Sequence, residues 1–350
     1  MANPMKKSQH AITHQKHLTL FFTAFKMLAA CLLGFTLILH CHLPESVWCI
    51  ITIAAVTQAG LDQTLTKSLM RCIGTLVGAV LGCLIVWVGK NNLAITLPLV
   101  FIAIYVTSQI ALQPTIYSYA GIVTGMTIAI IVFFNLVHQN IIAMAIDRTI
   151  EVLLGIGLLS AINIMLYPTV KYFFNYSISN KSPSWTLPTF SLHSAYTIAS
   201  LKVSIACIGT FLICYYCKLP QGYWATLTCL LIMEENTKGT IKKGIFRFFA
   251  HFIAAGIGLF FVLIFLHLPY SWRIIPLAIT FFLCGLLIGT KNQYASMGNT
   301  LGIAVAIMLL TTPGTQETIQ VILERFYNVV IGIAVAYMML SFRLRTLFPN

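Results

Sequence analysis

Charged residues are scarce in this sequence. Asp, Glu, Lys and Arg make up 8% of the 350 residues, whereas a soluble globular domain carries about a quarter. Carboxylates are rarest, because Asp and Glu together number only 8. Hydrophobic residues reach 59%, and the mean hydropathy is +0.89. A chain with so little polar surface is not a soluble globular protein.

Motifs that would mark an enzyme are also missing. The glycine-rich P-loop sequence does not occur, so no activity driven by nucleotide hydrolysis is indicated, and any energy-coupled activity would have to use the proton gradient. No His, Asp and Ser set and no metal-ligand cluster occurs at a catalytic spacing, which makes an enzyme acting on lipid the least favoured function. We expect no enzymatic activity, no cofactor and no metal site.

Hydrophobic runs that suit the ~30 Å hydrocarbon core of a bilayer recur along the whole chain. They predict an all-α polytopic membrane protein with twelve transmembrane helices. The first six runs are 18–40, 46–61, 70–89, 92–111, 115–136 and 143–166. The second six are 198–217, 222–235, 247–267, 273–290, 294–311 and 322–341.

The two halves match each other at an offset of 176 residues. The polar matches decide this interpretation, because apolar residues coincide easily in any membrane protein. We infer a duplicated six-helix unit. An even number of helices per copy leaves both copies in the same orientation, as parallel repeats. The identical pairs are 43/219, 44/220, 48/224, 52/228, 64/240, 67/243, 71/247, 79/255 and 82/258.

The distribution of Lys and Arg predicts that both termini are cytoplasmic. With the N-terminus inside, fifteen of these residues fall in inner segments and five in outer ones. The net charge of +13 is therefore a topology signal and does not indicate nucleic acid as a partner. The predicted regions are a cytoplasmic tail (1–17), the first repeat (18–167), a polar linker (168–197), the second repeat (198–342) and a cytoplasmic tail (343–350).

The second span of each half is unusually short. Short segments at corresponding places in two repeats are typical of a substrate site, because a half-helix leaves polar backbone at mid-depth. A tilted helix that fills a gap between its neighbours would give the same pattern, and both interpretations stay open.

Each half also carries a Lys and an Arg, four residues apart, at the start of its third span. This spacing places both on one helical face, where they would attract anions. The alternative is an ordinary positive flank whose side chains reach the cytoplasm. We favour that alternative for the lysines and anion binding for the arginines, because Arg holds carboxylates in a bidentate manner. The residues are Lys67, Arg71, Lys243 and Arg247.

An acidic residue followed directly by arginine lies inside the sixth span of each half. Such groups either hold helices together as an internal ion pair or act as a counter-ion or proton relay on the pathway. Glu234, at the inner end of the eighth span, is a further coupling candidate whose counterpart is Gln58, so its role would be asymmetric. The other residues of this group are Asp147, Arg148, Glu151, Glu324 and Arg325.

Small residues recur at a spacing of four in several spans. This spacing predicts seams where helices pack closely. The clearest examples are Gly74, Gly78 and Gly82, Gly121 and Gly125, and Gly298 and Gly302.

At these motifs the chain resembles the fusaric acid resistance-like, or aromatic acid exporter, family, and more distantly the aluminium-activated malate transporters of plants. The motifs are GYWATLT…MEE…GT…KG…R over 222–247 and VWCIITIAAVTQA…T…KSLMRCIGTLVGAVLG over 47–82. The resemblance covers most of both halves. It implies an inner-membrane protein that moves organic, often aromatic, carboxylate anions. Many members carry large cytoplasmic domains after each half, and we expect a short form without them.

We therefore expect a transporter that exports small organic anions. Arg71 and Arg247 would draw the carboxylate to the inner mouth, and the anion would then pass Arg148 and Arg325. Aromatic faces and hydroxyl donors would come from Trp48, Trp224, Thr52 and Thr228.

The expected partners are a small organic anion and the lipid bilayer. The resemblance also implies a membrane fusion protein, and a homo-oligomer stays open. Two other functions compete with export: a passive organic-anion channel, which the plant resemblance favours, and a non-transporting membrane scaffold of an envelope assembly.

Overall fold

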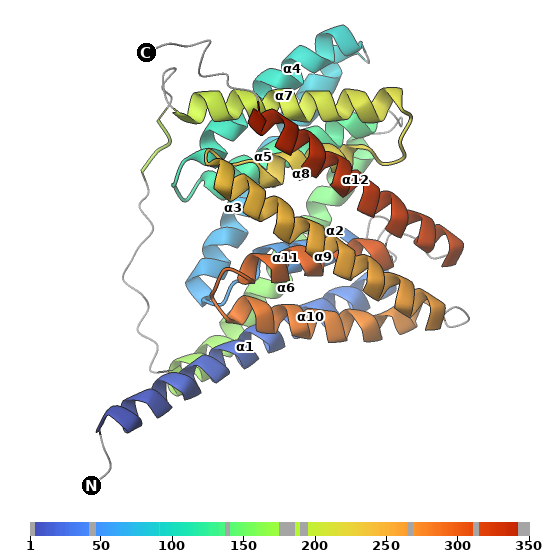
Figure 1. Ribbon diagram of the computed structural model, residues 1–350. Coiled ribbons are helices and arrows are strands. Elements are labelled where there is room, and N and C mark those ends of the chain that lie inside the picture. The colour runs from blue at the N-terminus through green and yellow to red at the C-terminus, as the bar shows by residue number, and fades with distance from the viewer. Residues whose placement is uncertain are drawn as a thin grey trace. The chain divides into compact units, whose positions relative to one another are not determined.

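A computed structural model describes residues 4–41, 47–90, 92–136, 141–174, 186–189, 195–264, 269–310 and 315–341. In these ranges every regular element is a helix, which confirms the predicted all-α class (Figure 1). The helices are α1 (Pro4–Cys41), α2 (Val47–Val56), α3 (Leu61–Gly89), α4 (Leu93–Leu112), α5 (Ser118–Asn135), α6 (Ile141–Phe174), α7 (Ala195–Tyr216), α8 (Tyr223–Ile232), α9 (Thr237–Ile264), the 3₁₀ helix η1 (Tyr270–Arg273), α10 (Ile274–Gly289), α11 (Ala295–Leu310) and α12 (Thr315–Ser341).

The helices identify a multi-pass membrane protein. Among the described residues, 9 helices are long and apolar enough to cross a bilayer, while α2, α8 and α11 are apolar but shorter. Both α2 and α8 have 10 residues, which rise about 15 Å, half of the hydrocarbon thickness. The short second helix of each half is thus confirmed, whereas twelve crossings stay a prediction.

One face of α3 shows why the chain needs a lipid environment. Large apolar side chains succeed one another along this face, and they are exposed by 39% or more of their surface. A continuous apolar surface of this kind is costly in water and stable against acyl chains. The residues are Leu69, Ile73, Leu76, Val77, Val80, Leu84 and Trp87.

Two helices extend into segments that were predicted to be a tail and a linker. Helix α1 begins at Pro4, inside the segment expected to be a tail, and α6 continues to Phe174, inside the expected linker. Most of that linker, 175–185 and 190–194, and the tail 343–350 lie outside the described residues.

The chain divides into two compact units. Unit 1 comprises 1–68, 151–182 and 253–319, and unit 2 comprises 69–150, 183–252 and 320–350. Each unit combines helices from both sequence halves: α1, α2, α10 and α11 in unit 1, and α4, α5, α7 and α8 in unit 2. The units are thus interleaved along the chain.

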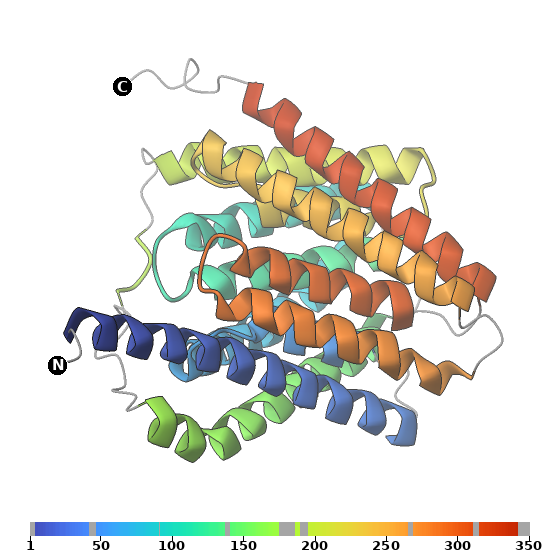
Figure 2. The same cartoon turned by 60° about the horizontal axis from the view of Figure 1, so that its bottom comes forward.

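In unit 1, α1 lies along α10 (Figure 2). Helix α2 packs on α11. Glycines allow the close approach: a side chain at Gly285 or Gly289 of α10 would meet the backbone of α1. Helix α6 touches α2 at Gly155, where a Cβ would lie 2.6 Å from the Cys49 carbonyl oxygen and 3.0 Å from Thr52 Cβ. The short helix α2 is therefore enclosed by its neighbours, and its residues are buried.

The C-terminal end of α2 is closed by an asparagine of α11. Asn299 Nδ2 donates to the Ala54 carbonyl at 2.6 Å and to the Thr57 carbonyl at 3.0 Å. The last carbonyls of a helix lack intrahelical donors, so a side-chain amide at this place satisfies groups that would otherwise be unpaired.

Replacing Asn299 with aspartate should destabilise the protein by about 2 kcal/mol, because it removes the donor from two helix-end carbonyls and places a negative charge beside them. The thermal unfolding midpoint in detergent measures this effect. Gln293→Glu makes the same change of charge at an exposed position and serves as the control. Equal midpoints for the two variants would refute the capping role.

In unit 2, α4 contacts α5 and α7, and α8 contacts both α5 and α7. The predicted glycine seam of α3 is confirmed, because a Cβ at Gly74 or Gly78 would lie 2.7 Å from an atom of α5. Phe133 of α5 stacks on Phe211 of α7 with ring centroids 3.9 Å apart. These contacts hold α8 in the middle of the unit.

The surroundings of α8 repeat those of α2. A Cβ at Gly332 of α12 would meet the Ala225 carbonyl oxygen and would lie 2.7 Å from Thr228 Cβ. In unit 1, Gly155 of α6 makes the corresponding approach to α2. The equivalent pairs differ by 176 or 177 residues and are Cys49 with Ala225, Thr52 with Thr228, and Gly155 with Gly332.

Candidate functional site

Helix α8 separates two cavities of unit 2. One, of about 330 Å³, lies at its C-terminal end and is lined by residues of α4, α5, α7, α8 and α9. The other, of about 710 Å³, lies at its N-terminal end, beside α5, α7 and α12. The two cavities thus lie at opposite ends of a 10-residue helix, whose length is about 15 Å.

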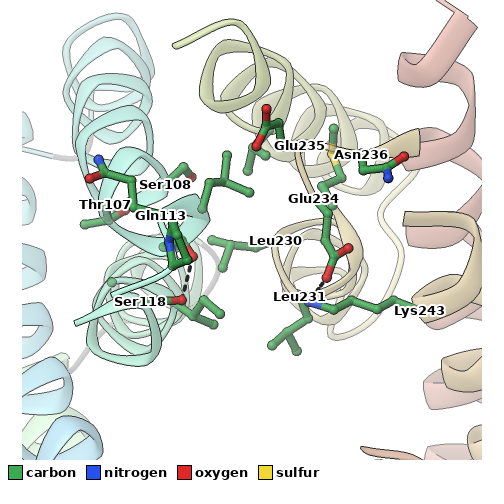
Figure 3. A pocket seen from close by; sticks show the side chains of 17 residues that line it. Thr107, Ser108, Gln113, Ser118, Leu230, Leu231, Glu234, Glu235, Asn236 and Lys243 are labelled. Carbon is green, nitrogen blue, oxygen red and sulfur yellow. Dashed lines mark hydrogen bonds and ion pairs between the residues drawn. The ribbon is translucent and has the colours of Figure 1, made fainter. Parts of the chain in front are cut away.

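The smaller cavity is polar (Figure 3). Thr107, Ser108, Gln113 and Ser118 lie on one side, and Glu234 and Lys243 lie on the other. Lys243 Nζ and Glu234 Oε1 form an ion pair of 2.7 Å, with the two side chains 46% and 35% exposed. At this exposure the pair contributes little to stability and can open.

The larger cavity is aromatic. Its walls include the stacked pair Phe133 and Phe211, together with Tyr215, Tyr216 and Tyr223. Glu324 of α12 is an acidic residue of its lining and accepts a hydrogen bond of 2.7 Å from Gln320. Flat apolar walls with a few polar groups suit a small aromatic ligand.

Arg247 of α9 contacts α8, whose two ends face the two cavities. It comes one turn after Lys243 on α9, and its Nε donates to Thr228 Oγ1 of α8 at 3.3 Å. His251, one turn further, is buried, and its Nδ1 lies 2.9 Å from the Arg247 carbonyl oxygen. The guanidinium group is thus oriented towards α8 from the neighbouring helix.

Arg325 of α12 is buried, with 2% of its surface exposed. Its guanidinium carbon lies 2.9 Å from the ring centroid of Trp224, a cation–π contact. Its Nε and Nη1 have no hydrogen-bond acceptor within the described part of the chain. Trp224 also contacts Tyr223, at 5.0 Å between centroids, and Tyr223 lines the aromatic cavity.

Three pairs of the predicted site residues are in direct contact: Thr228 with Arg247, Trp224 with Arg325, and Glu234 with Lys243. All six belong to unit 2. Arg71, in the same unit, is buried and donates to the Tyr119 hydroxyl at 3.2 Å.

The remaining predicted residues are divided between the units. Arg148, buried, and Asp147, partly exposed, belong to unit 2. The predicted residues of unit 1 are Trp48, Thr52 and Glu151, which are buried, and Lys67, which is partly exposed.

Sequence reasoning missed two polar residues beside these groups in unit 2 and one in unit 1. His251 occupies the place of Thr75 in the other half, and a histidine within an apolar run was the available signal. Tyr119 carries no such signal. Lys26 of α1 is buried and donates to Thr64 Oγ1 at 3.3 Å in unit 1, and a lysine inside a hydrophobic span could have indicated it.

Comparison with protein families matches residues 21–162 and 206–339 to the family described as fusaric acid resistance protein-like. The matched ranges cover most of the chain, with one range in each sequence half. Comparisons with the curated proteins and with the solved structures gave no match. Within the described ranges, no group of three or more His, Cys, Asp and Glu side chains could hold a metal ion. On the extent of the family match, the chain belongs to the fusaric acid resistance protein-like family.

Proposed function

We propose that this protein exports small organic carboxylate anions, chiefly aromatic ones, from the cytoplasm across the inner membrane. The family consists of transport proteins, which supports a transport function. One observation carries the choice of anions: two guanidinium groups, of Arg247 and Arg325, contact one short helix, and no described carboxylate forms an ion pair with either.

The charge balance explains why an anion would bind there. A buried guanidinium group without a counter-ion is costly inside a membrane. Arg325 is almost fully buried, and the adjacent Glu324 carboxylate is bonded to Gln320. A substrate carboxylate would supply the missing negative charge and accept bidentate hydrogen bonds.

The proposed route runs along α8. A carboxylate enters at the polar cavity, where Lys243 can exchange Glu234 for the substrate, and then reaches Arg247, one turn along α9. Thr228 offers a hydroxyl, and Trp224 offers an aromatic face beside Arg325. The aromatic cavity receives the ring of the substrate at the other end of the helix.

The wider architecture belongs to the same proposal: twelve spans in two parallel six-helix repeats, with both termini in the cytoplasm. The equivalent glycine contacts on α2 and α8 support the duplication, as do the two matched ranges. Export is coupled to the proton gradient in this scheme, with Asp147, Glu151, Glu234 and Glu324 as the candidate carriers. Arg71 and Arg148 would serve as further anion contacts.

Replacing Trp224 with leucine should slow export of benzoate about thirtyfold, because a desolvated cation–π contact contributes about 2 kcal/mol. Trp224→Phe keeps an aromatic face for Arg325 and should retain most of the rate. Trp87→Leu is the control, because Trp87 is 75% exposed on α3. Benzoate efflux from proteoliposomes measures the three rates. If Trp224→Leu and Trp87→Leu behave alike, Trp224 has no part in the route.

The same proteoliposomes test the proposed function as a whole. Benzoate efflux driven by a pH gradient, without steady current in its absence, is the expected result. A steady ohmic current without a pH gradient would select the passive channel instead. Loss of a partner complex in a deletion strain, without sensitivity to aromatic acids, would select the scaffold.

A further inference from the structure

The two short helices end in the same turn, but they differ in how their last carbonyl groups are satisfied. In unit 1, Thr64 Oγ1 accepts the Gln58 N–H at 3.1 Å. In a continued helix the Gln58 N–H would donate to the carbonyl of Ala54. That carbonyl is therefore left without its helical donor. The amide of Asn299 replaces that donor and also reaches the carbonyl of Thr57.

In unit 2, α8 ends with the same turn. Thr240 Oγ1 accepts the Glu234 N–H at 2.9 Å, so the carbonyl of Leu230 loses its helical donor as well. The position that corresponds to Asn299 is Ile122 of α5, which cannot donate. No described residue donates a hydrogen bond to the carbonyl of Leu230 or of Met233, and both residues line the polar cavity together with Ile122.

The cavity wall carries negative charge in addition. Glu234 is neutralised by Lys243, but Glu235 is a second carboxylate of the lining. A helix C-terminus adds a partial negative charge at the same place. The lining also includes Gln113, whose Oε1 accepts the Thr189 N–H at 2.9 Å, and Ser118, whose hydroxyl donates to the Ala111 carbonyl at 2.7 Å. Both oxygen atoms keep a lone pair that can face a cation.

We propose that this cavity binds a monovalent cation, whose charge takes the place that the Asn299 amide occupies in unit 1. An alkali-metal ion with its water and a primary ammonium group share the chemistry required: one positive charge directed at two carbonyls and a carboxylate. A volume of about 330 Å³ accommodates either. The site shares the polar cavity at which the proposed anion route begins, beside the Lys243 and Glu234 pair, and it does not include Arg247 or Arg325. It rests on the two carbonyl groups and the Glu235 carboxylate, so its test does not depend on the identity of the transported anion.

The test is a cation titration of the purified full-length protein in nanodiscs, read as the thermal unfolding midpoint. NaCl, KCl and methylammonium chloride are titrated separately, and choline chloride holds the ionic strength constant, since choline has no N–H group. A saturable rise of the midpoint with at least one of the three cations is expected, because a ligand of the folded state stabilises it. A response to alkali ions or to methylammonium alone identifies the source of the charge. No response to any of the three would overturn the proposal.

Ile122→Asn supplies the missing amide and should abolish the response, while Ile122→Leu should keep it. Glu235→Gln, which removes one charge at an exposed position, should weaken binding about tenfold. The Glu235 variant decides the question even if Ile122→Asn does not fold. An unchanged titration in Glu235→Gln, or in a folded Ile122→Asn, would contradict a cation site at the end of α8.

Discussion

Arg247→Ala should reduce benzoate export about a hundredfold at an unchanged amount of protein in the membrane. The guanidinium group of Arg247 is held towards α8 by Thr228, and a charge-assisted hydrogen bond to a carboxylate contributes about 1.5–3 kcal/mol. The loss should appear in the rate of transport, because the substrate must pass this group. Initial rates of benzoate efflux from proteoliposomes provide the measurement.

Two matched variants separate this role from general effects of charge. Lys242→Ala removes a cation from the same helix at an exposed position, where Lys242 lies over the ring of Phe246 at 5.7 Å, and should leave the rate unchanged. Arg247→Lys keeps the charge but loses the bidentate geometry, so we expect an intermediate rate. Efflux by Arg247→Ala at the wild-type rate would remove this arginine from the route.

The double variant Arg71→Ala with Arg247→Ala extends the argument to the other half. Arg71 donates to the Tyr119 hydroxyl and occupies the place of Arg247 in the first half. We expect no measurable export from the double variant. Retained export at normal expression would discard the proposed anion contacts of both halves together.

The sequence was sufficient for the helical class and for the contacts that a period of four residues dictates. Trp224, Thr228 and Arg247 could be selected because polar residues that recur in a duplicated apolar chain need a reason to be there. The proximity of Lys243 to Arg247 could also be anticipated, because the two residues share a helical face. The helix that each arginine would contact could not be derived, since it depends on how distant segments pack.

The difference between the two short helices was equally hidden in the sequence. Gln58 and Glu234 mark an asymmetry, but the replacement of Asn299 by Ile122 has a meaning only once both are seen at the end of a short helix. The compact units, which combine α1 with α10 and α4 with α7, are likewise a property of tertiary packing. An internal repeat predicts that the two halves make equivalent contacts. It does not predict which helices of the first half pack against which helices of the second.

Gly155→Ala should prevent the protein from folding to its normal stability. The added Cβ would lie 2.6 Å from the Cys49 carbonyl oxygen, and a backbone carbonyl inside an enclosed helix cannot shift easily. Overpacking of this kind costs about 3 kcal/mol, a large part of the stability of a folded domain. The expected result is a much lower thermal unfolding midpoint and a reduced yield of monodisperse protein.

Gly157→Ala provides a control in the same helix, because its Cβ would meet nothing within 4 Å. Alanine favours a helix over glycine by about 0.5–1 kcal/mol, so this variant should be as stable as the parent or more stable. Gly332→Ala in α12 and Gly209→Ala in α7 form a second pair in unit 2, and of these two glycines only Gly332 approaches α8. If Gly155→Ala and Gly332→Ala both fail while their controls fold, the enclosure of the two short helices is a requirement of the fold. Equal stability within each pair would show that α2 and α8 are not tightly enclosed, and the orientation of Arg247 by Thr228 would lose its structural basis.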